Sequence, residues 1–177
     1  MGFKKISLLT ALLLLNSCSA NSNSAGSQIT KIITCEDKAT PEEFISLLHE
    51  KKGGSVLSGH LGNGEDGEYT TSSPVEIWGY LVNSFSYHVG SNQDGDFTEF
   101  RAIIPRTSNV QSLQSIAETA SIPKIADNYY YKAVGGSDLL LRQYGDDVII
   151  SCAIDVRTTK KSINRFMREL QEHHNDQ

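Results

Sequence analysis

A hydroxyl and an imidazole come close together at Ser58-Gly59-His60, within a glycine-rich stretch of the chain. Serine and histidine act together as nucleophile and general base when a third group orients the imidazole. No orienting group is evident near this tripeptide, and the Gly-x-Ser-x-Gly turn of the α/β hydrolases does not occur in the sequence. A small hydrolase with a site near His60 therefore stays an alternative function, and the sequence identifies no catalytic residue.

The metal-ligand patterns of this chain are incomplete. None of its five histidines lies four residues from another, the spacing that lets two histidines bind zinc from one helix face. The nearest approach to a calcium loop is Asn92, Asp94, Asp96 and Glu99, whose oxygen-bearing side chains alternate as calcium ligands do. The sixth position of such a loop needs glycine and is Phe97 here. We therefore expect no metal site and no cofactor.

Glu65, Asp66 and Glu68 stand together in the glycine-rich segment 53–71. Clustered glycines favour exposed loops, so the sequence predicts an acidic loop over 62–68. Such a loop is either simply solvated or docks a basic partner, and these three carboxylates are the candidate partner-binding residues. The aromatic run 129–131 is either a second contact surface or a half-buried strand.

The overall charge of the chain narrows the class of partner. Lys and Arg number 16 against 21 Asp and Glu, which gives a net charge of −5 at pH 7. An acidic protein is repelled by phosphate backbones and by anionic lipid surfaces, so neither nucleic acid nor such a surface is expected as the main partner. A basic protein partner is compatible with this charge.

The first residues have the order of a secretory signal peptide: Lys4 and Lys5, the apolar run 6–15, and then small polar residues before Cys18. The run is too short for a membrane-spanning helix, which needs about 20 residues. The sequence Leu15-Asn16-Ser17-Cys18 resembles the lipobox of bacterial lipoproteins, although Asn16 is not the commonest residue at its position. The alternative is an ordinary cleaved signal with an incidental cysteine.

The lipoprotein resemblance implies cleavage before Cys18, diacylglyceryl attachment to its sulfur and an acylated N-terminus, which together anchor a protein firmly to a membrane. Ser19, in place of aspartate, resembles a sorting signal for the outer membrane facing the periplasm, which we favour over the inner membrane. The expected organisation is a signal peptide over 1–17, a lipidated flexible tether over 18–28 and a single domain over 29–177.

Lipidation of Cys18 would leave two further cysteines, Cys35 and Cys152. In the oxidising compartment that the resemblance implies, such a pair usually forms a disulfide. The sequence predicts that this disulfide joins the first strand of the domain to the last. The alternative is two buried free thiols.

The domain is predicted to be α+β, an antiparallel sheet with three or four helices packed against it and one disulfide. A capping box with proline at the first helical position, Thr40-Pro41-Glu42-Glu43, opens the clearest helix. A similar pattern favours a helix over 74–83, where the alternation of apolar residues also allows a strand. The other predicted elements are a strand over 29–35, a hairpin of 85–89 and 97–104, a helix from Ser108 to before Pro123, a meander of strands over 129–134, 138–144 and 148–156, and a helix over 159–173.

This order of elements resembles the sandwich of the Mog1/PsbP-like proteins in topology, and the resemblance implies no site residues. The favoured function is a lipid-anchored, non-enzymatic protein-binding module of the bacterial envelope. It has the form of an immunity or inhibitor protein against a periplasmic toxin or hydrolase, and its partner would be another envelope or secreted protein. The alternatives are an accessory or assembly lipoprotein of an envelope or secretion complex, and the small hydrolase.

Overall fold

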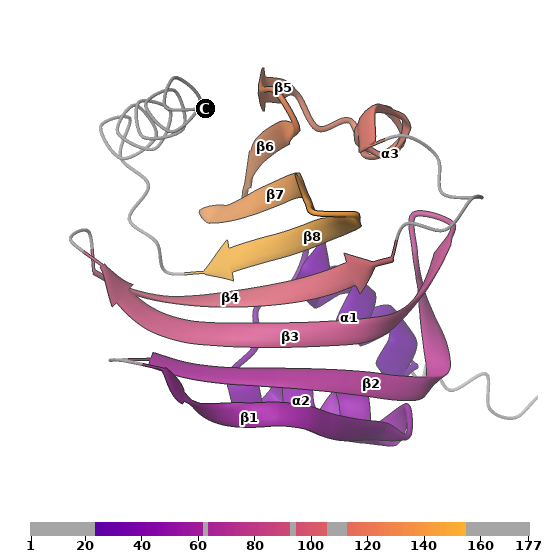
Figure 1. Ribbon diagram of the computed structural model, residues 1–177, viewed down its shortest axis with the longest axis vertical. Coiled ribbons are helices and arrows are strands. Elements are labelled where there is room, and N and C mark those ends of the chain that lie inside the picture. The colour runs from indigo at the N-terminus through magenta and orange to yellow at the C-terminus, as the bar shows by residue number, and fades with distance from the viewer. Residues whose placement is uncertain (1–23, 62–63, 93–94, 106–112, 155–177) are drawn as a thin grey trace, which may run out of the picture.

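The structure is a computed structural model that describes residues 24–61, 64–92, 95–105 and 113–154. Within these residues eight strands form one antiparallel sheet, accompanied by three helices (Figure 1). The α+β class with an antiparallel sheet is confirmed in outline, although the domain contains more sheet than expected. The strands, in their order across the sheet, are β1 Gly53–Leu61, β2 Gly64–Ile77, β3 Tyr80–Asn92, β4 Gly95–Ile104, β8 Asp147–Ile154, β7 Ser137–Tyr144, β6 Tyr129–Val134 and β5 Lys124–Ala126.

Helix α2, Pro41–Glu50, begins as the sequence predicts. The backbone N–H of Glu43 donates to the Thr40 hydroxyl at 3.3 Å, and the Thr40 N–H donates to the Glu43 carboxylate at 2.8 Å. This capping box satisfies two donors that would otherwise lack partners at the helix start. Phe44 and Leu48, one turn apart, are buried and hold the helix against the sheet.

The strand expected over 29–35 is wrong, because residues 25–33 form helix α1, Ala25–Ile33. Ser24 caps this helix, whose first residues come from the segment expected as tether over 18–28. Ile29, Ile32 and Ile33 are all buried. Their spacing of three and four residues is that of a helix face, and the charged Lys31 between them interrupts any strand alternation.

The exposed loop predicted over 62–68 is also wrong for residues 64–68, because they belong to strand β2, while residues 62–63 lie outside the described residues. Gly67 shows why the clustered glycines of this segment do not indicate a loop. A Cβ at this position would lie 2.3 Å from Cε1 of Tyr87 and 2.9 Å from Cε2 of Tyr69, whose rings stack beside it. This glycine therefore serves close packing inside a strand, one of the roles that glycine has in sheets.

The helix predicted over 74–83 is wrong, and its strand alternative is right. Val75 and Ile77 are buried at the end of β2, and β3 starts at Tyr80. The two residues between the strands, Trp78 and Gly79, have φ of 50° and 85°, which makes a tight hairpin turn.

The other predictions from strand alternation hold. The β3–β4 hairpin and the β6–β7–β8 meander are present, with strands somewhat longer in β3 and β4 than expected. Helix α3, Leu113–Ala120, ends before Pro123 as expected and buries Leu113 and Ile116, while the expected start at Ser108 lies outside the described residues. The expected helix over 159–173 lies outside the described residues.

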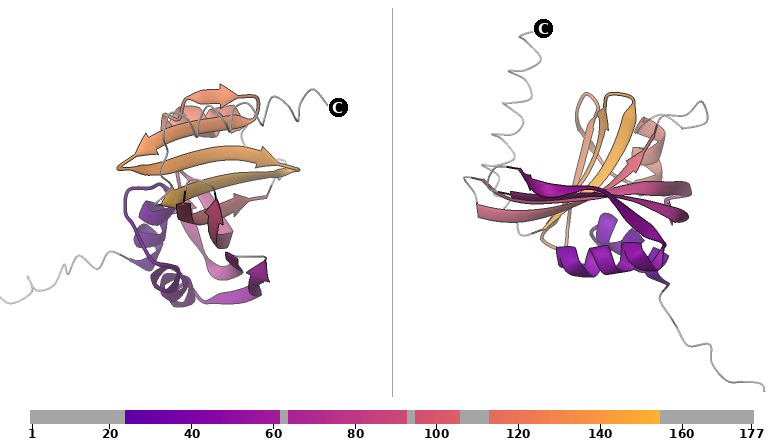
Figure 2. Two further views of the ribbon diagram at one scale, coloured as in Figure 1. Left: turned by 90° about the vertical axis from the view of Figure 1, so that its left-hand side faces the viewer. Right: turned by 60° about the horizontal axis from the view of Figure 1, so that its bottom comes forward.

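The two faces of the sheet differ in character. Helices α1 and α2 cover one face of the sheet, and the right-hand view of Figure 2 shows these two helices beneath the twisted strands β1–β4. Helix α3 packs against β7. Phe44 of α2 anchors the core of this helix face, with ring centroids 4.8 Å from Phe100 and 6.4 Å from Phe85. Along each strand the side chains between these core residues must point to the opposite face.

The predicted disulfide between Cys35 and Cys152 is present, with 5.4 Å between the two Cα atoms. Cys35 lies just after the C-terminal end of helix α1, and Cys152 lies within β8. The disulfide therefore joins the end of a helix to the last strand, and not the first strand to the last as expected. Cys152 is fully buried. No helix among the described residues is long and apolar enough to cross a membrane.

Candidate functional site

The face of the sheet opposite the helices carries a band of polar and charged side chains, here called the polar face. Directly paired residues in an antiparallel sheet point to the same side, so the register defines this face. Asp66 pairs with His88 and His88 with Glu99, while Ser86 pairs with Arg101 and Arg101 with Ser151. The polar face comprises Asp66 and Glu68 of β2, Ser86 and His88 of β3, Glu99 and Arg101 of β4, Ser151 of β8 and Arg142 of β7.

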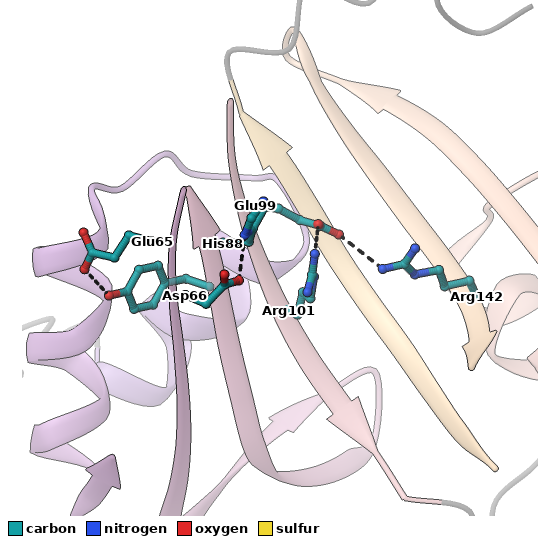
Figure 3. A network of polar contacts seen from close by, with 7 residues as sticks. Glu65, Asp66, His88, Glu99, Arg101 and Arg142 are labelled. Atoms are coloured by element: carbon teal, nitrogen blue, oxygen red, sulfur yellow. Dashed lines mark hydrogen bonds and ion pairs between the residues drawn. The ribbon is translucent and has the colours of Figure 1, made fainter. Parts of the chain in front are cut away.

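Glu99 is the centre of this face. Figure 3 shows its carboxylate between two guanidinium groups. Arg101, two residues along the same strand, donates a hydrogen bond to Oε2, and Nη2 of Arg142 lies 3.8 Å from Oε1. Only 11% of the Glu99 side chain is exposed, against 26% and 27% for the two arginines. The charged cluster is therefore buried at its centre and partly open at its rim.

The charges of this cluster reinforce one another. Burial opposes ionisation of Glu99, but the hydrogen bond from Arg101 and the charges of Arg101 and Arg142 outweigh it and lower the pKa of the carboxyl. Burial likewise opposes the charge of Arg101, and Glu99, Asp66 and Glu68 together raise the pKa of the guanidinium. Glu99 and Arg101 are consequently both charged at neutral pH.

Two donors in the cluster are not satisfied. The Nε atoms of Arg101 and Arg142 are buried and have no hydrogen-bond partner among the described residues. An unmatched buried donor costs about 1–3 kcal/mol of folding free energy. Apolar side chains of similar size in place of a buried ion pair often leave stability unchanged or raise it, so stability alone does not account for the cluster.

His88 and Asp66 form a second polar contact on the same face, with 2.6 Å between Nδ1 and Oδ1 (Figure 3). Both side chains are about one-quarter exposed. A carboxylate at Nδ1 fixes the orientation of an imidazole, as it does in hydrolases. Among the described residues, however, no hydroxyl or thiol is hydrogen-bonded to His88.

The three acidic residues singled out in the sequence do not form one surface. Asp66 and Glu68 lie on the polar face, and Glu68 is exposed. Glu65 points to the other side, where its carboxylate accepts a hydrogen bond of 2.5 Å from the Tyr87 hydroxyl. Burial, followed by the bond to Glu65, raises the pKa of Tyr87. The acidic loop is therefore replaced by a strand that presents two of the three carboxylates together.

The remaining candidates from the sequence are dispersed. Cys18, the expected lipidation site, and Asp94 lie outside the described residues, and so does the side chain of His60. Glu99 of the calcium-like pattern is held by arginines, and no group of three or more metal-ligating side chains occurs in the described part of the chain. In the aromatic run, Tyr130 is buried on the helix face, and Tyr131 donates to Asp138 at 2.8 Å.

Sequence reasoning missed Arg101 and Arg142 as site residues. A signal was present in β4, where the polar residues Glu99 and Arg101 alternate with the apolar residues Phe100 and Ala102. That alternation predicts a strand with one polar face. The partnership with Arg142 depends on the pairing of β4 with β8 and of β8 with β7, which no local pattern reveals.

Comparison of the chain with family models, curated proteins and solved structures found no significant match. The topological resemblance to the Mog1/PsbP-like proteins accordingly stays an expectation.

Proposed function

We propose that the chain is a non-enzymatic protein-binding module, held at the bacterial envelope by lipid on Cys18, and that its partner docks on the polar face. One observation supports this most strongly: a charged cluster of Glu99, Arg101 and Arg142 persists on a sheet face, with unmatched buried donors that cost stability. Buried polar groups that lower the stability of a fold are usually found where a function requires them.

The form of the polar face suits recognition. Its side chains come from β2, β3, β4, β7 and β8 of one hydrogen-bonded sheet, so they are held in place before a partner arrives. Preorganised side chains lose little conformational entropy on binding. Arginine is among the residues that contribute most to protein interfaces, and Arg101 and Arg142 are each about one-quarter exposed at the rim of the cluster.

The chemistry of the partner follows from the charges. Asp66 and Glu68 form the acidic side of the polar face, on β2, while the arginines lie toward β7. A partner with basic groups opposite β2 complements this arrangement, and it also suits the net acidic chain. An immunity or inhibitor protein would have one such partner, a soluble toxin or hydrolase of the periplasm. An accessory lipoprotein would instead associate with several integral membrane proteins.

Affinity purification of the lipidated chain from its native membrane, read by mass spectrometry, tests this proposal. We expect one protein, soluble and basic, to be recovered in a one-to-one ratio. Arg142→Gln should weaken its recovery, while Lys132→Gln, an exposed residue that pairs with Leu139 on the helix side of the sheet, should not. Recovery of no protein, or equal recovery by the two variants, would contradict the proposal.

A further inference from the structure

The two edges of the sheet are protected very differently. A strand at a sheet edge presents unpaired N–H and C=O groups, and proteins commonly block these with short strands, proline or charge. The β5 edge has all three features: it is three residues long, begins with Lys124 and follows Pro123. The β1 edge is nine residues long, Gly53–Leu61, and contains no proline, lysine, arginine, aspartate or glutamate.

No described element lies beyond β1 in the sheet, which Figure 1 shows at the end of the strand order. Leu61 and Gly64 face each other across a two-residue connection, and the pair that closes such a connection exchanges hydrogen bonds. Bonded and non-bonded pairs then alternate along the strands. Ser58, which pairs with Gly67, falls in a non-bonded pair, so its backbone N–H points toward the open edge.

We infer that β1 accepts an extended, basic strand of the partner, which continues the sheet through main-chain hydrogen bonds. This inference rests on the proposed function and specifies how that partner docks. Addition of a strand to an exposed sheet edge is a recurrent mode of recognition, in which alternate side chains of the added strand provide specificity.

The acidic residues of β2 explain why the strand should be basic. Gly59 of β1 pairs directly with Asp66 and adds no side chain between β2 and the sheet edge, although the Asp66 carboxylate itself contacts His88 on β3. Strands lie about 4.8 Å apart, so an added strand would run about 10 Å from β2, a gap that a lysine or arginine and the acidic side chain can span together. Leu57 pairs with the exposed Glu68, which offers a second carboxylate at the same side. A basic residue on the added strand would meet Glu68, and the negative charge of Asp66 would attract its basic neighbours on the same side of the sheet.

A second copy of the chain suits this edge less well. Antiparallel pairing of two β1 strands would bring two sets of Asp66 and Glu68 onto one continuous face. Like charges gathered in this way repel each other and oppose association. Charge complementarity therefore favours a different, basic chain as the occupant.

The test uses a phage-displayed library of short random peptides as the probe, selected against the purified full chain. We expect the selected peptides to carry Lys or Arg at every second position, and their binding to slow hydrogen exchange at the Ser58 amide. Ser58→Pro should weaken binding at least about tenfold, whereas the matched variant Ile125→Pro on the β5 edge should bind as the original chain does. Glu68→Gln should weaken binding of the basic peptides.

Several results would overturn the inference. These are peptides without the basic alternation, no selected peptide at all, or binding that leaves exchange at Ser58 unchanged. The exchange measurement uses the unaltered chain, so it decides the matter even where Ser58→Pro does not fold. If a partner is recovered from the membrane equally well by Ser58→Pro, the proposed function stands and the inference is wrong. If peptides bind β1 as expected but no envelope protein is recovered, the inference stands and the proposed function is wrong.

Discussion

Glu65 and Asp66 are adjacent in the chain, yet their carboxylates lie on opposite faces of the sheet. Glu65 accepts a hydrogen bond from Tyr87 on the helix side, and Asp66 contacts His88 on the polar face. Because successive residues of a strand point to opposite sides, these two carboxylates belong to separate networks. Their energetic coupling should follow the sheet faces and not the sequence.

A double-mutant cycle tests this separation. We expect Glu65→Gln and Tyr87→Phe to be coupled by about 1 kcal/mol in the free energy of unfolding, because the first removes the charge of the acceptor and the second removes the donor of the same hydrogen bond. Glu65→Gln combined with His88→Gln should be additive within about 0.5 kcal/mol. Urea denaturation at pH 7 measures the three single and the two double variants. Strong coupling between positions 65 and 88 would show that the two faces communicate.

Removal of the Glu99 charge should destabilise the fold in a pH-dependent way. Glu99→Gln leaves two guanidinium groups without their shared carboxylate, and we expect a loss of roughly 3 kcal/mol in the free energy of unfolding at pH 7. Folding lowers the pKa of Glu99 below its ordinary value of about 4.3. Its stabilisation is therefore present at neutral pH and is lost as the pH falls below about 4.3 toward the lowered value.

Urea denaturation of both proteins in steps between neutral and acidic pH measures this difference. The deficit of the variant should shrink as the pH falls, because protonated Glu99 resembles glutamine. Glu68→Gln, on the same face but exposed, serves as the control and should change stability by no more than about 0.5 kcal/mol. A deficit that is equal at all pH values would show that shape, and not charge, makes Glu99 important.

Gly67 should be intolerant of a single added methyl group. A Cβ there would overlap the ring of Tyr87 at 2.3 Å, so Gly67→Ala should cost about 1–3 kcal/mol in the free energy of unfolding. Gly54→Ala is a matched control, because Gly54 lies in the neighbouring strand and a Cβ there meets nothing within 4 Å. Thermal denaturation of the two variants measures the contrast. Similar melting temperatures would mean that the two tyrosine rings move apart easily.

The Cys35–Cys152 bond should contribute strongly to stability. It closes a loop with a sequence separation of 117 residues, and restriction of an unfolded loop of that length stabilises a fold by up to about 5 kcal/mol. We expect Cys35→Ala with Cys152→Ala to unfold at lower urea concentration than the original chain. A reducing agent should bring the original chain close to the double variant and leave that variant unchanged. Insensitivity of the original chain to reduction would contradict the prediction.

Local signals in the sequence predicted several elements correctly. Thr40, Pro41 and Glu43 define the start of α2, because the capping groups act within a single turn. Alternation of side chains, with glycine-containing turns at 135–136 and 145, gave the β6–β7–β8 meander. The first two of these inferences need only neighbouring residues. The pairing of Cys35 with Cys152 followed from the lipoprotein resemblance, which assigns Cys18 to lipid and implies an oxidising compartment for the other two cysteines.

Two of the errors depend on packing or pairing between distant segments. Gly67 looked like part of a loop because the sequence cannot reveal that the Tyr69 and Tyr87 rings fill the space beside it. The proline and glutamate at 74–76 resembled a second helix start. Pro74 instead lies at a register shift in β2, where a strand tolerates a proline.

The sequence by itself determined the start of α2, the strands of the β6–β7–β8 meander and the acidic balance of the chain, and the lipoprotein resemblance implied Cys35 and Cys152 as a pair. Only the tertiary structure decided which charges meet. The cluster of Glu99, Arg101 and Arg142 depends on the order β4-β8-β7. The same pairing separates Glu65 from Asp66. Strand order and register are set by burial of one whole sheet face against the helices, a property of the assembled fold that no short stretch of sequence contains.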